Sequence, residues 1–431
     1  MTQLDGMPET EGLTLSLGEA LWAGETEPEE FFKTLPHALV EVSHGVGFVA
    51  SSGNVVVLKS MVGLILVDTS GPMSSPHVIE QVRSWSGEPI THVVLTHGHL
   101  DHVSGLRLLD EDAVELGQDP PVVVAHRSMP SRFDRYSRTA GWNTTINERQ
   151  FHPVKFQWPT TYRAPDVLFD EEHDLEVGGL VLRLHHARGE TGDATWVHLP
   201  EERIVCTGDL FIWVCPNAGN PQKPQRYALE WAHALRRIAV TSPVLLLPGH
   251  GPPIQGKDRI QDALLSTARL LERLDSDVVA MMNEGKRLDE IISCVRAPVE
   301  FLEKPFLKPI YDDPEFIVRN IWRLYGGWWD GNPSTLLPAP DSIVAEEVAT
   351  LAGGVDRLVE RSRTLADEEN LRLAGHLIEM ASLAAPTNAM VLEAHAAIYE
   401  MRANAEPSSM ARAIFQDAAR RSRAALAGIQ M

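Results

Sequence analysis

The sequence predicts an α+β protein in which a four-layer αββα sandwich is followed by an all-α module of helical hairpins. Between residues 38 and 256, short runs rich in β-branched residues alternate with a few helical patterns, in two halves of similar build. From about residue 261 the strand pattern ceases, and apolar residues recur at helical spacing almost to the end. Two sheets packed face to face, with helices outside, would bury the apolar runs of both halves.

The composition indicates a globular protein with an acidic surface. The chain has 431 residues and a formal net charge of −21, which opposes general attraction to nucleic acid or anionic membranes. Its three cysteines, Cys206, Cys215 and Cys294, predict neither a disulfide framework nor a thiolate zinc site. The N-terminus does not resemble a signal peptide, and no apolar run approaches the ~20 residues of a membrane span. We therefore expect a cytoplasmic protein with no nucleic acid partner and no membrane span.

The first half of the predicted sandwich follows an N-terminal arm of residues 1–34. Three apolar runs between Val46 and Val67, separated by short turns, predict a meander of antiparallel strands. Helix, strand, helix and strand patterns come next, over residues 74–87, 91–96, 106–117 and 121–126. Residues 127–160 are rich in Arg, Asn and aromatic residues without clear periodicity, and we interpret them as a long surface or lid segment.

The second half repeats the pattern of a strand followed by a polar loop. Strands are predicted over residues 166–170, 174–187, 194–200, 203–213 and 244–251, with a helix over 227–239. Three of these strands end in polar clusters, which are residues 188–193, 207–209 and 248–251. The predicted domains are residues 1–34, 35–260 and 261–431.

Four potential metal ligands lie within six residues, directly after the apolar run 93–95; they are His97, His99, Asp101 and His102. A surface loop that happens to be rich in histidine is the alternative. Two ions held about 3.5 to 4 Å apart can share a water, convert it to hydroxide near neutral pH and stabilise a developing oxyanion. Since the later polar loops can supply the remaining ligands, we favour a two-metal site.

This loop resembles the signature of the metallo-β-lactamase superfamily, a strand followed by His-x-His-x-Asp-His. The resemblance covers roughly residues 38–256, and the sandwich it implies is the metallo-β-lactamase fold. It assigns His97 and His99 to one metal ion and Asp101 and His102 to the other. It also implies that Asp209 bridges both ions, that His250 completes the second site, that Asp101 and Asp209 are the catalytic carboxylates, and that Asp68 is a structural acid.

One position departs from the commonest pattern of that superfamily. Many members have a histidine where this chain has Glu190, which then becomes the expected third ligand of the first metal. His185, His186 and Asp193 could substitute for it. A glutamate here resembles the alkylsulfatase branch, as do residues 323–338 and 373–405, which are similar to its dimerisation domain. The resemblance therefore implies a homodimer formed through the helical module.

The chain also departs from the alkylsulfatases. They usually have a second glutamate where Asp209 stands, a further C-terminal domain, and an arginine in a sulfate-binding segment that here is the distinct run 216–226. Two divalent ions, three carboxylates and a hydroxide sum to about zero charge, so an anionic ester needs additional cations. We expect Lys223 and Arg226 to provide them, with Arg188 and the Arg-rich segment behind, although a solvated basic turn is the alternative.

Two further groups are candidates for contact with the substrate. Asn143 and Asn147 could donate hydrogen bonds to an ester oxygen. The aromatic cluster Trp322, Tyr325, Trp328 and Trp329 could line a substrate tunnel, form a dimer contact, or simply pack the two modules together.

The predicted function is hydrolysis of a small-molecule ester, most favourably an alkyl or aryl sulfate, by a metal-bridging hydroxide. The alternatives are a thioester, lactone or phosphodiester substrate, an iron-dependent sulfur oxidoreductase of the same fold, or a binding protein that has lost activity. Imidazole ligands favour two Zn2+ ions, while the additional carboxylate makes Mn2+ or Fe2+ acceptable.

Overall fold

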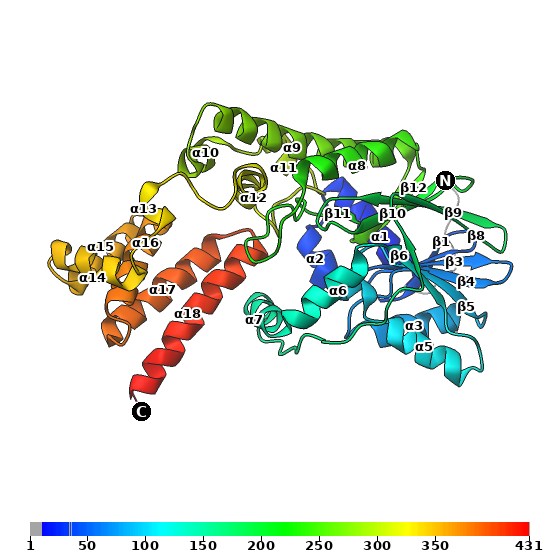
Figure 1. Cartoon of the computed structure of the whole chain (residues 1–431), viewed down its shortest axis with the longest axis horizontal. Helices are drawn as coiled ribbons and strands as arrows, with labels where there is room; N and C mark the ends of the chain where they lie inside the picture. The colour runs from blue at the N-terminus through cyan, green and yellow to red at the C-terminus, as the bar shows by residue number, and fades with distance from the viewer. Residues whose placement is uncertain (1–10, 34, 36, 431) are drawn as a thin grey trace.

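Two β-sheets packed face to face form the centre of the first part of the chain (Figure 1). The structure is a computed structural model, and it describes residues 11–33, 35 and 37–430. Helices α3 (Ser75–Trp85) and α5 (Leu106–Glu115) cover the first sheet, and α8 (Ala228–Val240) and α9 (Lys257–Asn283) cover the second. The predicted four-layer sandwich followed by a helical module is thus confirmed.

The first sheet has seven strands, arranged in the order of the sequence. They are β1 (Leu39–Ser43), β2 (Val46–Val49), β3 (Val55–Ser60), β4 (Gly63–Val67), β5 (Ile90–Val94), β6 (Val122–His126) and β7 (Val167–Phe169). Strands β2 to β4 form the predicted antiparallel meander, β1 adds an antiparallel strand that was not predicted, and β4 to β7 pair in parallel. Alternate residues of β3 enter different cores: Val56 and Leu58 face the second sheet, while Val55 and Val57 join the core beneath α3 and α5.

The second sheet has six strands in the order β13-β12-β11-β10-β9-β8. Their bounds are β8 (Glu172–Val177), β9 (Leu180–Ala187), β10 (Ala194–Leu199), β11 (Ile204–Ile212), β12 (Leu245–His250) and β13 (Ile254–Gln255). Only β11 and β12 pair in parallel, and α8 connects them. All nine residues of β11 are buried, as expected of a strand covered on both faces.

Residues 127–160 differ from the predicted lid segment because they begin with two helices. Helix α6 spans Met129–Arg138 and α7 spans Ala140–Gln150. Met129, Phe133 and Tyr136 lie at helical spacing on the buried face of α6, and its arginines surround that face. The helix was not predicted because its amphipathic pattern consists of only three buried residues among many polar ones.

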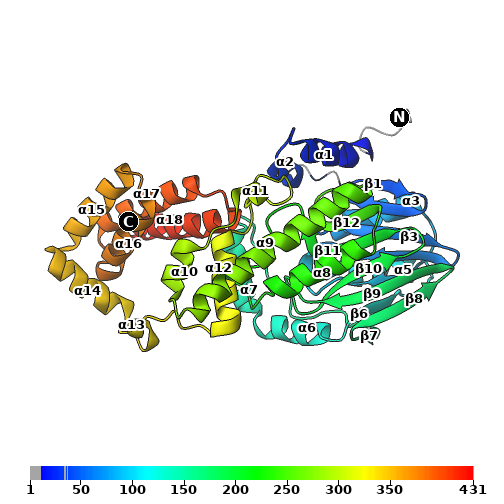
Figure 2. The same ribbon diagram turned by 90° about the horizontal axis from the view of Figure 1, so that it is seen from above.

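The N-terminal arm contains α1 (Glu11–Ala23) and α2 (Pro28–Lys33), which lie beside the sandwich (Figure 2). Trp22 stacks on Phe306 with ring centroids 5.5 Å apart, so the arm joins the main core. Residues 1–10 and 34 of the predicted arm lie outside the described residues.

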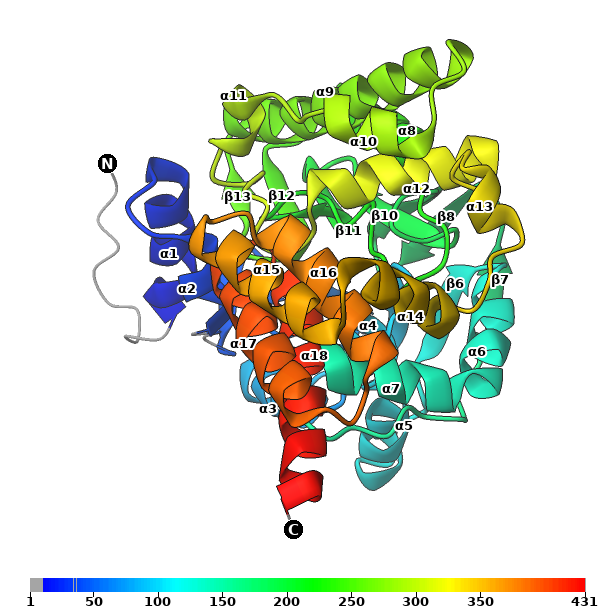
Figure 3. The same ribbon diagram turned by 90° about the vertical axis from the view of Figure 1, so that its left-hand side faces the viewer.

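The helical part projects from one end of the sandwich (Figures 1 and 2), and Figure 3 views the molecule from that end. The helices after α9 are α10 (Leu288–Cys294), α11 (Val299–Leu302), α12 (Pro314–Gly326), α13 (Pro333–Leu336), α14 (Asp341–Ala352), α15 (Val355–Asp367), α16 (Leu371–Ala384), α17 (Ala389–Ala405) and α18 (Ser409–Gln430). Of these, α10 and α12 still pack into the core of the sandwich. Helices α14 to α18 enclose a separate core rich in alanine, which lets neighbouring helices approach closely.

Helix α9 shares the core of the sandwich rather than that of the C-terminal helices. Leu264, Leu271 and Val278 on α9 belong to the same buried cluster as the strands. The first core therefore continues past residue 260, where we placed the domain boundary; that division stays a prediction. Among the helices of the described ranges, none is both long enough and apolar enough to cross a bilayer.

Candidate metal centre

Seven side chains from strand ends and their following loops meet at one edge of the sandwich. His97, His99, Asp101 and His102 follow β5, with the last two in the short helix α4 (Leu100–Val103). Glu190 follows β9, Asp209 lies in β11, and His250 ends β12. Parallel pairing places β11 beside β12, which explains how residues 41 positions apart reach the same edge.

The ligand atoms fall into two groups that meet at one carboxylate. His97, His99 and Asp209 form the first, and Asp101, His102 and His250 the second, with the ligand atoms of each group within 4.8 Å of one another. Asp209 reaches both: its Oδ2 is 3.4 Å from His97 Nε2, and its Oδ1 is 3.3 Å from His102 Nε2. This is the arrangement expected of a bridging carboxylate.

Backbone geometry holds Asp209 in this place. Gly249 lies opposite Asp209, and a Cβ added there would come within 2.2 Å of Asp209 Oδ1. Gly208 has a φ of +49° and a Cβ there would meet Thr96 Cβ at 2.6 Å. Glycine at both positions therefore allows β11 to approach the ligand loop and β12 closely.

Asp68 fixes the orientation of His102. Its Oδ2 lies 2.8 Å from His102 Nδ1, and its Oδ1 accepts a hydrogen bond of 2.7 Å from the amide of Thr96. With Nδ1 engaged, His102 presents Nε2 to Asp209. Such a carboxylate behind a histidine fixes the imidazole ring and tautomer and raises its basicity as a ligand.

Glu190 lies beside the first group but is also engaged by two other side chains. Its Oε1 is 3.8 Å from His99 Nδ1, 2.5 Å from an Arg226 guanidinium nitrogen, and 2.6 Å from the donating amide of Asn217. Burial raises the pKa of Glu190 and outweighs the opposing effect of Arg226. Its carboxylate stands at the edge of the ligand cluster, beside the first group and outside it.

The three alternatives to Glu190 have other partners. His185 stacks on Trp196 and lies 3.1 Å from a carboxylate oxygen of Glu172, while His186 stacks on His126. Asp193 pairs with Arg132, with 2.6 Å between Oδ1 and a guanidinium nitrogen. Glu190 is likewise paired, with Arg226, but it lies 3.8 Å from His99, and this position favours it as the third ligand of the first metal site.

The charge state of the cluster also favours binding of cations. His250, His102 and His97 outweigh the effect of burial and hold the pKa of Asp209 well below its usual value. Two inward-facing atoms, His102 Nε2 and Asp209 Oδ1, are buried without a hydrogen-bond partner. Unpaired buried polar atoms are rare, and here both are oriented as metal ligands would be. Four imidazoles and three carboxylates that converge in this way fit divalent metal ions.

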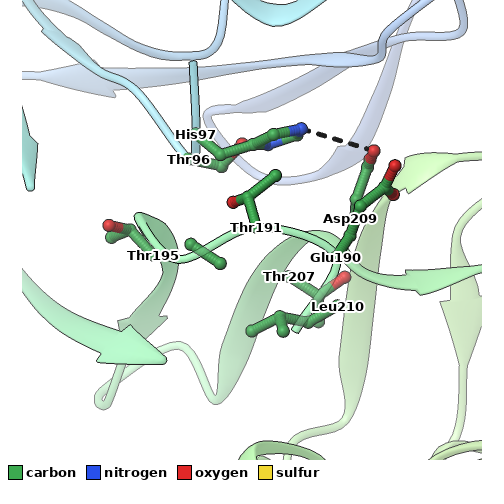
Figure 4. A pocket seen from close by; sticks show the side chains of 9 residues that line it. Thr96, His97, Glu190, Thr191, Thr195, Thr207, Asp209 and Leu210 are labelled. Atoms are coloured by element: carbon green, nitrogen blue, oxygen red, sulfur yellow. Dashed lines mark hydrogen bonds and ion pairs between the residues drawn. The ribbon is translucent and has the colours of Figure 1, made fainter. Parts of the chain in front are cut away.

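A small hollow lies directly behind the first group (Figure 4). Its wall includes His97, Glu190 and Asp209 from the cluster, and Figure 4 shows His97 directed at Asp209. The rest is lined by Thr96, Thr191, Ala194, Thr195, Thr207 and Leu210. Three of the seven clustered side chains thus share this hollow with neutral residues of the strands and loops around it.

The two predicted cations occupy different environments. Arg226 is only 3% exposed and is paired with Glu190, whereas the Lys223 ammonium lies 5.5 Å from the centroid of the Trp158 ring. Burial and the nearby Arg226 lower the pKa of Lys223 to about 8. Lys223 therefore remains available to an incoming anion, while Arg226 is already neutralised.

The remaining predicted contacts lie mainly within the helices. Asn143 is buried in α7, where its amide donates to Thr139 Oγ1 over 3.0 Å, and Asn147 donates to the carbonyl of Asn143. In the aromatic cluster, Tyr325 donates to Asp275 on α9 over 3.1 Å, and Trp328 is 71% exposed. The contact between Tyr325 and α9 supports packing between the two parts as the role of that cluster.

Two residues that support the cluster were not identified as such from the sequence. Asn217 was only part of the run 216–226, yet it donates to Glu190. Arg132 was one of several arginines in the segment 127–138, yet it is the partner of Asp193. No local pattern distinguishes either residue from its neighbours.

Comparison with known proteins places these features in a family. The chain is 25% identical over 323 residues to a linear primary-alkylsulfatase from a Pseudomonas species, and 24% identical over 362 residues to an (R)-specific secondary-alkylsulfatase from Pseudomonas. The matches cover 70% and 78% of this chain but only 61% and 54% of those proteins. This chain thus spans little more than half the length of these relatives.

A solved structure extends the likeness to the three-dimensional fold. The stereoselective inverting sec-alkylsulfatase Pisa1 from Pseudomonas superposes with a TM-score of 0.81 at 23% identity, over 90% of this chain and 66% of that one. At this level of identity the match demonstrates the shared fold.

Two family models match consecutive parts of the chain. The model of the metallo-beta-lactamase superfamily matches residues 49–281, and the model described as alkyl sulfatase dimerisation matches residues 287–425. The first ends within α9, whereas the buried core of the sandwich continues through residues of α10 and α12. The chain therefore belongs to the metallo-beta-lactamase superfamily and carries an alkyl sulfatase dimerisation domain.

Proposed function

We propose that this protein is a dinuclear metallohydrolase that cleaves sulfate esters of alkyl or aryl alcohols. One observation carries the proposal: two groups of ligand atoms share Asp209 at an edge of the fold of this superfamily. Membership of the superfamily implies divalent metal ions, and the joined dimerisation domain favours the alkylsulfatases among its activities.

The proposed first site consists of His97, His99 and Glu190, and the second of Asp101, His102 and His250, with Asp209 shared. Two divalent ions held there would supply an activated water and neutralise negative charge that develops on the ester. Zn2+ suits the four imidazoles best, and the carboxylates make Mn2+ or Fe2+ acceptable.

The residues of the chain itself would hold and orient the substrate. We propose that Lys223 attracts the sulfate group, because its ammonium has no carboxylate partner among the ion pairs of the described residues. Arg226 and Asn217 hold Glu190. Arg226 therefore affects binding of the sulfate group only indirectly, through Glu190. Asn143 is proposed as a hydrogen-bond donor to the ester, through an adjustment of its present contact with Thr139.

The names of the relatives support the choice of a sulfate ester. Two are primary and secondary alkylsulfatases of Pseudomonas, and a third is the alkyl/aryl-sulfatase BDS1 of Saccharomyces cerevisiae, which is 22% identical over 364 residues. The matched dimerisation domain supports a homodimer formed through the helical module, which we propose for this chain.

Metal analysis and a substrate panel test the proposal together. Elemental analysis of the purified protein should find two divalent ions per chain. Dodecyl sulfate and 4-nitrophenyl sulfate should be hydrolysed faster than the matched phosphate diester, thioester and lactone, with activity removed by a chelator and restored by Zn2+ or Mn2+. One iron per chain with no second metal would overturn the dinuclear hydrolase, and cleavage of only the non-sulfate esters would overturn the substrate class.

A further inference from the structure

A buried ion pair stands directly behind the ligand loop and outside the ligand set. Asp193 is 1% exposed, and its Oδ1 lies 2.6 Å from one guanidinium nitrogen of Arg132. Its Oδ2 accepts a hydrogen bond of 2.8 Å from Arg132 Nε, so both carboxylate oxygens lie against the guanidinium and one of them is hydrogen-bonded to it. Hydrogen bonds between charged partners are stronger than those between neutral ones.

The same carboxylate holds the backbone of the ligand loop. Asp193 Oδ2 also accepts from the amide of Gly98 over 3.2 Å, and Gly98 is the residue between His97 and His99. A single buried acceptor therefore fixes the peptide group that connects the two imidazoles of the first site.

Helix α6 packs directly against Gly98 through Arg132. A Cβ added to Gly98 would lie 2.6 Å from Arg132 Cδ and 3.2 Å from Asp193 Oδ2. Arg132 is itself anchored, because its second guanidinium nitrogen donates to Tyr136 on the next turn of α6 over 3.3 Å. The ligand loop, Asp193 and α6 are thus packed together without room for another side chain.

The electrostatic state of the pair agrees with this role. Burial alone would raise the pKa of Asp193, but the charge and hydrogen bonds of Arg132 outweigh that effect and lower it to about 2. Asp193 is therefore a permanent anion whose charge is already balanced by Arg132.

We propose that Arg132 and Asp193 are positioning residues that set the spacing of His97 and His99 through the Gly98 amide, and so tune metal affinity at the first site. The inference rests on the proposed ligand set, but not on the identity of the ester. Supporting groups of this kind change metal affinity by about 10- to 100-fold when removed.

The test uses the full chain, stripped of metal and titrated with Zn2+ against a chromophoric chelator. Asp193→Asn should weaken binding of one Zn2+, the ion of the first site, by about 10- to 100-fold while two ions still bind at saturation. The absorption spectrum of the Co2+-loaded protein should also shift, since the two imidazoles no longer hold the same angle.

Two further variants separate positioning from stability. Asp112→Asn breaks a comparable pair with Arg83 on the outer helices α5 and α3 and should leave Zn2+ affinity unchanged. Arg132→Lys keeps the buried charge balanced but loses the hydrogen bond from Arg132 Nε, so it should weaken Zn2+ binding less than Asp193→Asn does. If Asp193→Asn does not fold, the Zn2+ affinity of Arg132→Lys alone tests the inference. Unchanged affinity in the Arg132 and Asp193 variants, an equal loss in Asp112→Asn, or loss of one whole ion at saturation would overturn the inference. Intact Zn2+ binding without sulfate hydrolysis would overturn only the proposed substrate.

Discussion

The two sides of the candidate site are built in different ways. The proposed metal ligands follow β5 and β9, lie within β11 and end β12, where strand pairing fixes the backbone nearby. Lys223, which is proposed to face the substrate, and Arg226, which holds Glu190, stand on residues 216–226. This loop is held by contacts with α7 and α12; for example, Arg149 donates to Gln222 and Arg323 to Gln225. Strand pairing thus fixes the positions of the metal ligands, whereas contacts with helices distant in the sequence fix the loop that is proposed to bind the substrate.

The largest effect should come from the residue shared by both ligand groups. Asp209→Ala removes an oxygen from each group, so both ions should be lost, with affinity reduced by more than the roughly 100-fold that supporting residues contribute. Elemental analysis after dialysis and hydrolysis of 4-nitrophenyl sulfate would measure it. The outer variant Asp112→Ala is the control, and retention of both ions in Asp209→Ala would contradict the bridging role.

The two groups should also be separable. Glu190→Ala is expected to lose the ion of the first group, and His250→Ala to weaken the ion of the second, each by more than about tenfold. Metal titration of both variants measures this. Unchanged metal content in Glu190→Ala would return His185, His186 and Asp193 to consideration.

On the substrate side, Arg226→Met should act mainly on stability. It leaves Glu190 buried without its partner, which typically costs about 3 to 5 kcal/mol in the free energy of unfolding. Urea unfolding of the metal-free protein measures this loss of stability. The loss should be smaller with metal bound, because the ions restore positive charge near Glu190. A double variant with Glu190→Gln should lose less than Arg226→Met alone; an equal loss would contradict coupling of the pair.

Lys223→Met should affect binding of the substrate and leave metal content intact. Loss of one charged contact to the sulfate corresponds to about a 10-fold rise in KM. Because the pKa of Lys223 is about 8, the wild-type lysine is a cation below that pH and loses its charge above it. KM for the sulfate ester should therefore rise as the pH increases through about 8.

Lys223→Arg provides the control for this assignment. It keeps the charge at high pH, so KM should stay low where that of the wild type rises. A KM that rises with pH equally in Lys223→Arg would assign the titration to another group.

The smallest effect is expected from Asn143→Ala. Its amide makes one neutral hydrogen bond, to Thr139, so the variant should lose about 1 kcal/mol of stability, and KM should rise by no more than about fivefold. Steady-state kinetics with dodecyl sulfate and urea unfolding measure the two effects. Asn147→Ala is the matched control in the same helix, and an equal KM in both variants would argue against ester contact by Asn143.

Short-range patterns in the sequence predicted the sandwich and the helical module, and the ligand set was predicted from the His-x-His-x-Asp-His loop together with a family resemblance. Apolar runs specify strands, and the ligands of the His-x-His-x-Asp-His loop lie within six residues. Only the tertiary structure decided what surrounds them. The partner of Asp193 is 61 residues away on α6, Arg226 is engaged with Glu190, and α9 joins the core of the sandwich. Such pairings depend on packing between elements distant in the chain, which no local spacing records.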